Sequence, residues 1–152
     1  MPVVGMVGGG QLARMTAAAA VGLGATFRVL AESAGESAAL VTHDVTVGSH
    51  LSLSDILEFA AGCDVITFDH EHVPGPVLAD LESAGVLVRP GSGALRYTQD
   101  KLAMRERLSA LGVPCPRFAP VAGTADVEAF AGGRLPVVLK AVSGGYDGKG
   151  VW

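Results

Sequence analysis

A lysine and a group of glycines near the end of the chain have the residue types of a phosphate-binding loop. Residues 137–139 are valine and leucine, which predict a buried strand, and Lys140 follows them directly. Four of the seven residues in 144–150 are glycines. Glycine backbones adopt positive φ and present N–H groups to an anion, and a lysine adds a point charge. Two interpretations stay open on these residues alone, a phosphate grip or a glycine-rich hairpin turn. The Walker A pattern is excluded, because its lysine follows the glycines.

A second glycine cluster lies near the start of the chain, between a predicted strand and a predicted helix. Residues 8–13 read Gly-Gly-Gly-Gln-Leu-Ala, which satisfies the degenerate dinucleotide fingerprint GxGxxA. Glu32 follows the next strand, where an acid that binds the ribose of NAD would stand. The alternative is a tight strand-to-helix turn that binds no ligand.

A third group of polar residues directly follows the strand predicted over residues 65–68. Asp69 and Glu71 alternate with His70 and His72. Ligands of open α/β sheets lie at the carboxyl ends of strands, so this loop is a candidate binding segment. The alternation does not define a metal geometry, and the simpler interpretation is a polar loop before the helix that starts near Pro76.

Alternating strands and helices predict that residues 1–97 form an α/β domain with a doubly wound parallel sheet. The predicted strands cover residues 3–7, 26–30, 45–47, 65–68 and 86–89. The predicted helices cover residues 11–23, 36–41, 52–61 and 76–84, the third starting at a variant capping box from Ser52 to Asp55.

A second domain is predicted over residues 98–152, after a glycine joint at 91–93. It would contain a helix over 100–111, a proline-rich linker, a short helix over 124–130 and the strand before Lys140. We expect that strand to find no later strand to pair with, so that the glycine loop after it would be mobile.

Composition argues against several classes of protein. The 152 residues carry a net charge of −4 without a basic run, which argues against a nucleic-acid surface. The apolar stretch over residues 16–25 is too short to span a bilayer, and we see no signal peptide. Cys63 and Cys115 lack metal-binding spacing. We expect reduced thiols in a cytoplasmic protein, with Cys63 packed near a strand.

The glycine loop with its lysine resembles the ATP-grasp nucleotide loop of the 5-(carboxyamino)imidazole ribonucleotide synthase family. The resemblance extends to residues 8–15, to residues 67–74, and to Arg96, three residues before Gln99. It runs from Val3 to Trp152 and covers the front part of such an enzyme. It implies a Rossmann-like pre-ATP-grasp domain followed by the start of an ATP-grasp domain.

The resemblance implies two sets of site residues and assigns no catalytic residue. Those expected to bind ATP are Arg96, Lys140, Gly144, Gly145, Tyr146, Asp147, Gly148, Lys149 and Gly150. Those expected to bind the ribonucleotide are Gly10, Gln11, Leu12, Glu71, Tyr146, Asp147 and Lys149. The departures from the family pattern are Ala13, Asp69, His72 and Ser143. Lys101 is interpreted as a lysine of the helix surface.

The reaction implied by the resemblance is the ATP-dependent carboxylation of 5-aminoimidazole ribonucleotide by bicarbonate, through carboxyphosphate, with release of ADP and phosphate. Mg²⁺ would accompany ATP, and its ligands are expected beyond residue 152. We therefore expect the 152-residue chain to be inactive by itself. A homodimer is compatible with this interpretation. The alternatives are a formate- or biotin-dependent ATP-grasp ligase, a nicotinamide-binding Rossmann protein, and a folding unit without activity.

Overall fold

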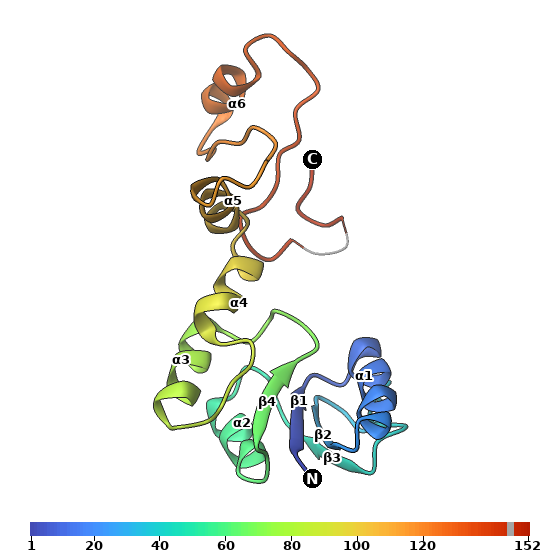
Figure 1. The fold of residues 1–152 in the computed structure, drawn as a ribbon. Coiled ribbons are helices and arrows are strands. Elements are labelled where there is room, and N and C mark those ends of the chain that lie inside the picture. The colour runs from blue at the N-terminus through green and yellow to red at the C-terminus, as the bar shows by residue number, and fades with distance from the viewer. Residues whose placement is uncertain (146–147) are drawn as a thin grey trace. The chain divides into compact units, whose positions relative to one another are not determined.

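The computed structural model describes residues 1–145 and 148–152 and divides into two compact units, Met1–Leu95 and Arg96–Trp152. The first unit holds a four-stranded parallel sheet in the order β3-β2-β1-β4. Its strands are β1 (Val3–Val7), β2 (Thr26–Ala31), β3 (Asp44–Val47) and β4 (Val65–Phe68), as Figure 1 shows. The helices are α1 (Gln11–Gly22), α2 (Leu53–Ala60), α3 (Gly75–Ser83), α4 (Ser92–Gln99), α5 (Lys101–Ala110) and α6 (Thr124–Ala131).

Helices cover both faces of the sheet, which confirms the predicted doubly wound α/β class. Successive residues of a strand point to opposite faces. Met6 of β1 therefore packs in one core cluster with Ala13 of α1, and Val7 packs in the other with Ile56 of α2 and Leu78 of α3. Figure 1 shows α1 on one side of the strands and α2 and α3 on the other. Because the strands are parallel, their carboxyl ends lie together along one edge of the sheet.

The helix start predicted at Ser52 is present, with a different set of capping bonds. The Ser52 hydroxyl accepts from the Asp55 backbone N–H at 3.3 Å and donates to the Asp55 carboxylate at 2.7 Å. The other oxygen of that carboxylate accepts from the Ser49 N–H at 2.8 Å, so it reaches beyond the cap residue. Hydrogen bonds from Ser49 and then Ser52 lower the pKa of Asp55.

Two predicted elements are weaker in the structure. Residues 36–41 form bends and turns where a short helix was expected, and the Ala38 N–H donates to the Gly9 carbonyl at 2.8 Å. The strand predicted over 86–89 is reduced to one parallel bridge between Val88 and Ile66.

The glycine joint predicted at residues 91–93 is wrong, because α4 begins at Ser92. The Glu82 carboxylate of α3 accepts from both the backbone N–H and the hydroxyl of Ser92. These bonds lower the pKa of Glu82 and satisfy a donor at the start of α4. The cap comes from a residue ten positions earlier, so no local pattern announces it.

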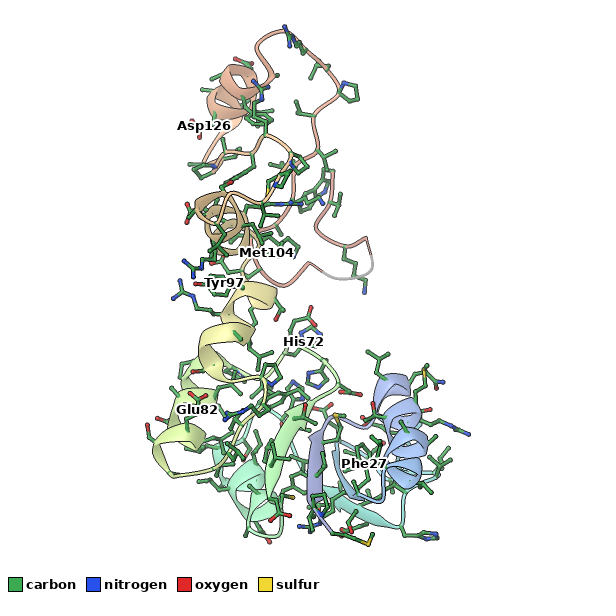
Figure 2. The ribbon with its side chains drawn as sticks, viewed as in Figure 1. Phe27, His72, Glu82, Tyr97, Met104 and Asp126 are labelled. Carbon is green, nitrogen blue, oxygen red and sulfur yellow. The ribbon has the colours of Figure 1, made fainter. Side chains whose placement is uncertain are left out.

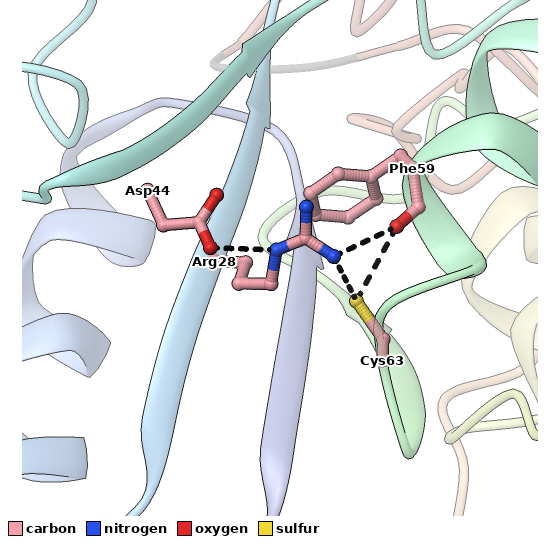
Figure 3. A network of polar contacts seen from close by, with 4 residues as sticks. All are labelled: Arg28, Asp44, Phe59 and Cys63. Carbon is pink, nitrogen blue, oxygen red and sulfur yellow. Dashed lines mark hydrogen bonds and ion pairs between the residues drawn. The ribbon is translucent and has the colours of Figure 1, made fainter.

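Arg28 of β2 connects this strand to β3 and to the end of α2 (Figure 3). Its Nε lies 2.8 Å from Asp44, its direct partner in the parallel register. Its Nη1 donates to the Phe59 carbonyl at 3.3 Å and to the Cys63 sulfur at 3.7 Å. Burial raises the pKa of the Cys63 thiol. Cys63 packs beside the core as predicted, since a Cβ built on Gly5 of β1 would lie 2.6 Å from its sulfur.

The second unit has little buried surface. Among its described residues only Ala131 is buried, and α5 contains no buried residue. The buried strand predicted before Lys140 is wrong, because Val138 is 65% exposed and Leu139 is 38% exposed.

The segment before Lys140 forms no regular strand, but it pairs with the last residues of the chain, where no pairing was expected. Leu139 and Trp152 exchange two backbone hydrogen bonds of 2.8 and 2.9 Å, and Lys140 bridges Val151 in antiparallel sense. Val151 and Trp152 thus pair with Lys140 and Leu139, and the glycine loop connects the two paired segments.

Candidate functional site

Gly8, at the end of β1, begins a turn that only glycine can occupy. Its φ is 113°, in the region that side chains avoid, and its N–H donates to Leu30 of β2 at 2.9 Å. A Cβ built on Gly8 would collide with the Asp69 carboxylate. The glycine therefore allows the carboxylate that follows β4 to reach the turn that follows β1.

Gly10, Gln11 and Leu12, which were predicted to bind the ribonucleotide, follow in the same turn and at the start of α1. The Gly10 N–H donates to Oδ2 of Asp69 at 2.8 Å, and Gly10 is the N-terminal cap of α1. The Gln11 side chain accepts from the Ser37 hydroxyl at 2.9 Å. Leu12 is 61% exposed. Hydrogen bonds of Gly10 and Gln11 thus fix the turn, whereas the Leu12 side chain is exposed.

Two acidic side chains lie near this turn, Glu36 beside Gly9 and Glu32 directly after β2. A Cβ built on Gly9 would collide with the Glu36 carboxylate, so an acid packs against the turn that should receive a pyrophosphate. Glu32, the expected ribose acid, lies 2.7 Å from Nδ1 of His50. Glu36 thus packs against the turn, and Glu32 is held by His50.

Three histidines lie close together next to this turn, His70 and His72 of the loop after β4 and His50 from beyond β3. The ring of His70 lies 4.7 Å from that of His50 and 5.1 Å from that of His72, measured between centroids. Figure 2 labels His72 in this loop, beyond the end of β4. Glu71, the predicted substrate residue, lies between His70 and His72 in the sequence and is half-buried. Neither the contact of Asp69 with Gly10 nor the approach of His50 was anticipated, because both depend on strand order.

The glycine loop of the second unit is closed at its base by backbone hydrogen bonds. The Ala141 N–H donates to the Gly150 carbonyl at 2.8 Å, directly after the bridge from Lys140 to Val151. Gly144, Gly148 and Gly150 have φ values of 70°, 80° and 70°. These are features of both a glycine hairpin and an anion-binding loop. Tyr146 and Asp147 lie outside the described residues, and Lys149 is exposed.

Lys101 is half-buried and contacts this loop, so its interpretation as a helix-surface lysine is wrong. Its Nζ donates to the Gly145 carbonyl at 3.1 Å. Arg96, expected beside the nucleotide phosphates, is exposed, and its guanidinium lies 5.0 Å from the centre of the Tyr97 ring. Figure 2 labels Tyr97 on α4. The contact of Lys101 spans 44 positions, so sequence spacing carried no sign of it.

Within the described residues, no group of three or more His, Cys, Asp or Glu side chains could hold a metal ion. In the same part of the chain, no helix has both the length and the apolar character needed to cross a membrane.

Comparison with known proteins places these features in one family of enzymes. The chain is 53% identical over 151 residues to the N5-carboxyaminoimidazole ribonucleotide synthase of Mycobacterium tuberculosis, covering 99% of this chain and 35% of that protein. It is 54% identical over 158 residues to the synthase of Mycobacterium leprae, covering 99% of this chain and 36% of that one. The chain thus spans little more than a third of the length of these curated relatives.

Solved structures agree in fold over nearly the whole chain. An ADP complex of the synthetase from Staphylococcus aureus has a TM-score of 0.89 at 28% identity, covering 99% of this chain and 40% of that one. The synthase of Aspergillus clavatus, in complex with ADP and 5-aminoimidazole ribonucleotide, has a TM-score of 0.83 at 26% identity, with the same coverages. The model of the ribonucleotide synthetase preATP-grasp domain matches residues 1–99, and the chain belongs to that family.

Proposed function

We propose that this chain supplies the ribonucleotide-facing domain and the glycine loop of an enzyme that carboxylates 5-aminoimidazole ribonucleotide with bicarbonate and ATP. The observation that carries the proposal is the hydrogen bond from Gly10 to Asp69. It brings the turn of Gly10, Gln11 and Leu12 beside the loop of Glu71 at the carboxyl edge of the parallel sheet. That edge is where α/β sheets bind their ligands.

The chemistry requires two anions to meet. ATP phosphorylates bicarbonate, and the exocyclic amine of the ribonucleotide captures the carboxyphosphate or the carbon dioxide released from it. Lysine and backbone N–H groups can neutralise phosphate charge in a site closed against water. Here Lys140 and the glycines at 144–150 have that composition, and we assign them to ATP, with Arg96 as a further contact. ATP bound in this way would bring Mg²⁺, whose ligands we assign to the part of the enzyme that follows the matched segment.

A chimera tests the assignment in a chain of the relatives' length. Residues 1–152 would replace the matching segment of the M. tuberculosis synthase, and ADP release dependent on bicarbonate and aminoimidazole ribonucleotide would be measured. Lys140→Ala should raise the Michaelis constant for ATP, because a charged phosphate contact contributes about 1.5–3 kcal/mol. A constant for ATP within a factor of about two of the parent, roughly 0.4 kcal/mol, would refute the role of Lys140.

The role of Glu71 is tested separately in the same chimera. Glu71→Ala should raise the Michaelis constant for the ribonucleotide and leave that for ATP unchanged. The competing nicotinamide interpretation predicts saturable binding of NADH by the 152-residue chain, lost in Glu32→Ala. We expect a fluorescence titration with NADH to show no saturable binding.

A further inference from the structure

Asp69 is buried and uses one of its two carboxylate oxygens. Its side chain is 5% exposed, and Oδ2 accepts from the Gly10 N–H at 2.8 Å. Oδ1 is buried with no hydrogen-bond partner within the described part of the chain. A buried oxygen without a donor is costly, so the group that faces it matters. That group is Nε2 of His70, 3.8 Å away.

The hydrogen bond at the other side of the His70 ring determines which nitrogen carries the hydrogen. Nδ1 of His70 accepts from the backbone N–H of His72 at 3.2 Å. A neutral imidazole has one donor and one acceptor nitrogen. Because Nδ1 accepts, the hydrogen lies on Nε2, the atom that faces Asp69. The Nε2–H of the neutral ring therefore faces the unused carboxylate oxygen at 3.8 Å, a polar contact longer than a hydrogen bond.

We propose that Asp69 and neutral His70 are a positioning pair that couples the turn at Gly10 to the loop carrying Glu71, and thereby sets the affinity for the aminoimidazole ribonucleotide. The pair connects the segment after β1 to the segment after β4 through three polar contacts, Gly10 to Asp69, Asp69 to His70, and His70 to His72. The proposal rests on the proposed function for its ligand. It assigns roles to two residues whose side chains need not touch that ligand.

The arrangement makes the coupling sensitive to pH. The groups facing His70 are Asp69, His50 and His72, and His50 itself contacts Glu32. Burial is the main cause that lowers the pKa of His70 from 6.5, assisted by the two neighbouring histidines and opposed by Asp69. His70 is therefore neutral at pH 7. Protonation at lower pH places a hydrogen on Nδ1, and the His72 N–H then loses its acceptor.

The first test determines the tautomer of His70 in the unmodified 152-residue chain. Long-range ¹H–¹⁵N spectra at pH 7.5 should show the hydrogen on Nε2, with a titration midpoint below that of an unfolded histidine. A hydrogen on Nδ1, or a midpoint above the ordinary value, would overturn the proposal. This readout needs no ligand and no variant, so it stays informative if the proposed function fails.

The second test measures binding of 5-aminoimidazole ribonucleotide by calorimetry. Asp69→Asn replaces one carboxylate oxygen by an NH₂ group, so it either loses the acceptor of the Gly10 N–H or turns a donor toward Nε2–H of His70, and we expect affinity at pH 7.5 to fall roughly tenfold. Asp64→Asn is the matched control, because Asp64 precedes β4 and accepts from the Val3 N–H at 2.7 Å at the opposite edge of the same strands. Its affinity should stay within about twofold of the parent.

The dependence of ribonucleotide affinity on pH distinguishes a positioning role of His70 from a general effect on the stability of the protein. The parent should lose affinity as pH falls from 7.5 to 5.5, whereas His70→Ala should bind weakly and without that step. Equal pH steps in both proteins, or equal losses in Asp69→Asn and Asp64→Asn, would overturn the proposal. If the parent binds no ribonucleotide while His70 has the expected tautomer, the proposed function fails and the Asp69–His70 contact stands.

Discussion

Lys101 makes two hydrogen bonds to the segment that carries the glycine loop, although it lies more than forty residues earlier. Its backbone N–H donates to the Val142 carbonyl at 2.9 Å, and its Nζ donates to the Gly145 carbonyl at 3.1 Å. Asp100, the residue before it, caps α5 by accepting from the Ala103 N–H. These two hydrogen bonds thus attach the segment of the glycine loop to the start of α5.

Removal of the Lys101 ammonium group should loosen the loop. Lys101→Met keeps the aliphatic stem and loses the contact with Gly145, and we expect the affinity of the chain for an ATP analogue to fall about fivefold, or about 1 kcal/mol. Arg105→Met, one turn further along α5, is the control and should change affinity less than twofold, as for an ordinary surface charge. Equal effects of the two variants would show that Lys101 contributes only net charge.

Gly8 and Gly22 should respond in opposite ways to the same added methyl group. Gly8→Ala requires a side chain at a φ of 113° and a collision with Asp69, and should cost about 2 kcal/mol or more. Gly22→Ala lies at the end of α1 with no atom within 4 Å of the new Cβ, and should stabilise by about 0.5 kcal/mol. Urea denaturation measures both, and a neutral Gly8→Ala would contradict the described turn.

Acidification should destabilise the first unit before any carboxylate is protonated. The pKa of His70 is lowered in the folded protein, so the unfolded chain takes up the proton more readily. The contribution of His70 is therefore complete above about pH 6.5, its unfolded value, and is lost as pH falls through the lowered folded value. The unfolding free energy measured between pH 7.5 and 5 should fall in the parent and fall less in His70→Ala. The same slope in both proteins would assign the effect to another histidine.

Limited proteolysis should distinguish the two units. Only Ala131 is buried among the described residues of Arg96–Trp152, whereas the first unit has core clusters on both faces of its sheet. Brief treatment with trypsin should therefore cut first at Arg117 and Arg134, which lie outside the helices, and leave Met1–Leu95 intact. Cleavage at Arg28 of β2 as fast as at Arg117 would show that the sheet is no more stable than the rest.

Removal of the N-terminal cap of α2 should lower the free energy of unfolding. Ser52→Ala removes the acceptor of the Asp55 N–H and one donor to the Asp55 carboxylate, and should cost about 1 kcal/mol. Ser54→Ala is the comparison, because its hydroxyl contacts the Ser52 hydroxyl at 3.0 Å and the Asp55 carboxylate at 3.4 Å but caps no backbone group in α2. Thermal unfolding would rank the two, and a larger effect at Ser54 would contradict the capping assignment.

Local chemistry was sufficient to predict the class of fold, and the resemblance of the motifs to a known family predicted the family. The alternation of apolar strands with helices, the glycines at 8–10 and the cap at Ser52 act within a few residues, and such short-range preferences can be read directly from the sequence. The same holds for the glycine loop, where residues 144–150 identified the type of protein before any contact was known. The start of α4 was missed because its cap, Glu82, comes from another helix.

The tertiary structure decided which of these residues act together. Asp69 reaches Gly10 only because β4 pairs with β1, and His50 meets His70 only because all strands of the sheet end at one edge. Lys101 supports Gly145 across 44 positions for the same kind of reason. Hydrogen bonds and burial depend on distances in space, which the order of strands and the packing of helices create. The sequence by itself therefore determined which residues were candidates, and the fold determined their partners.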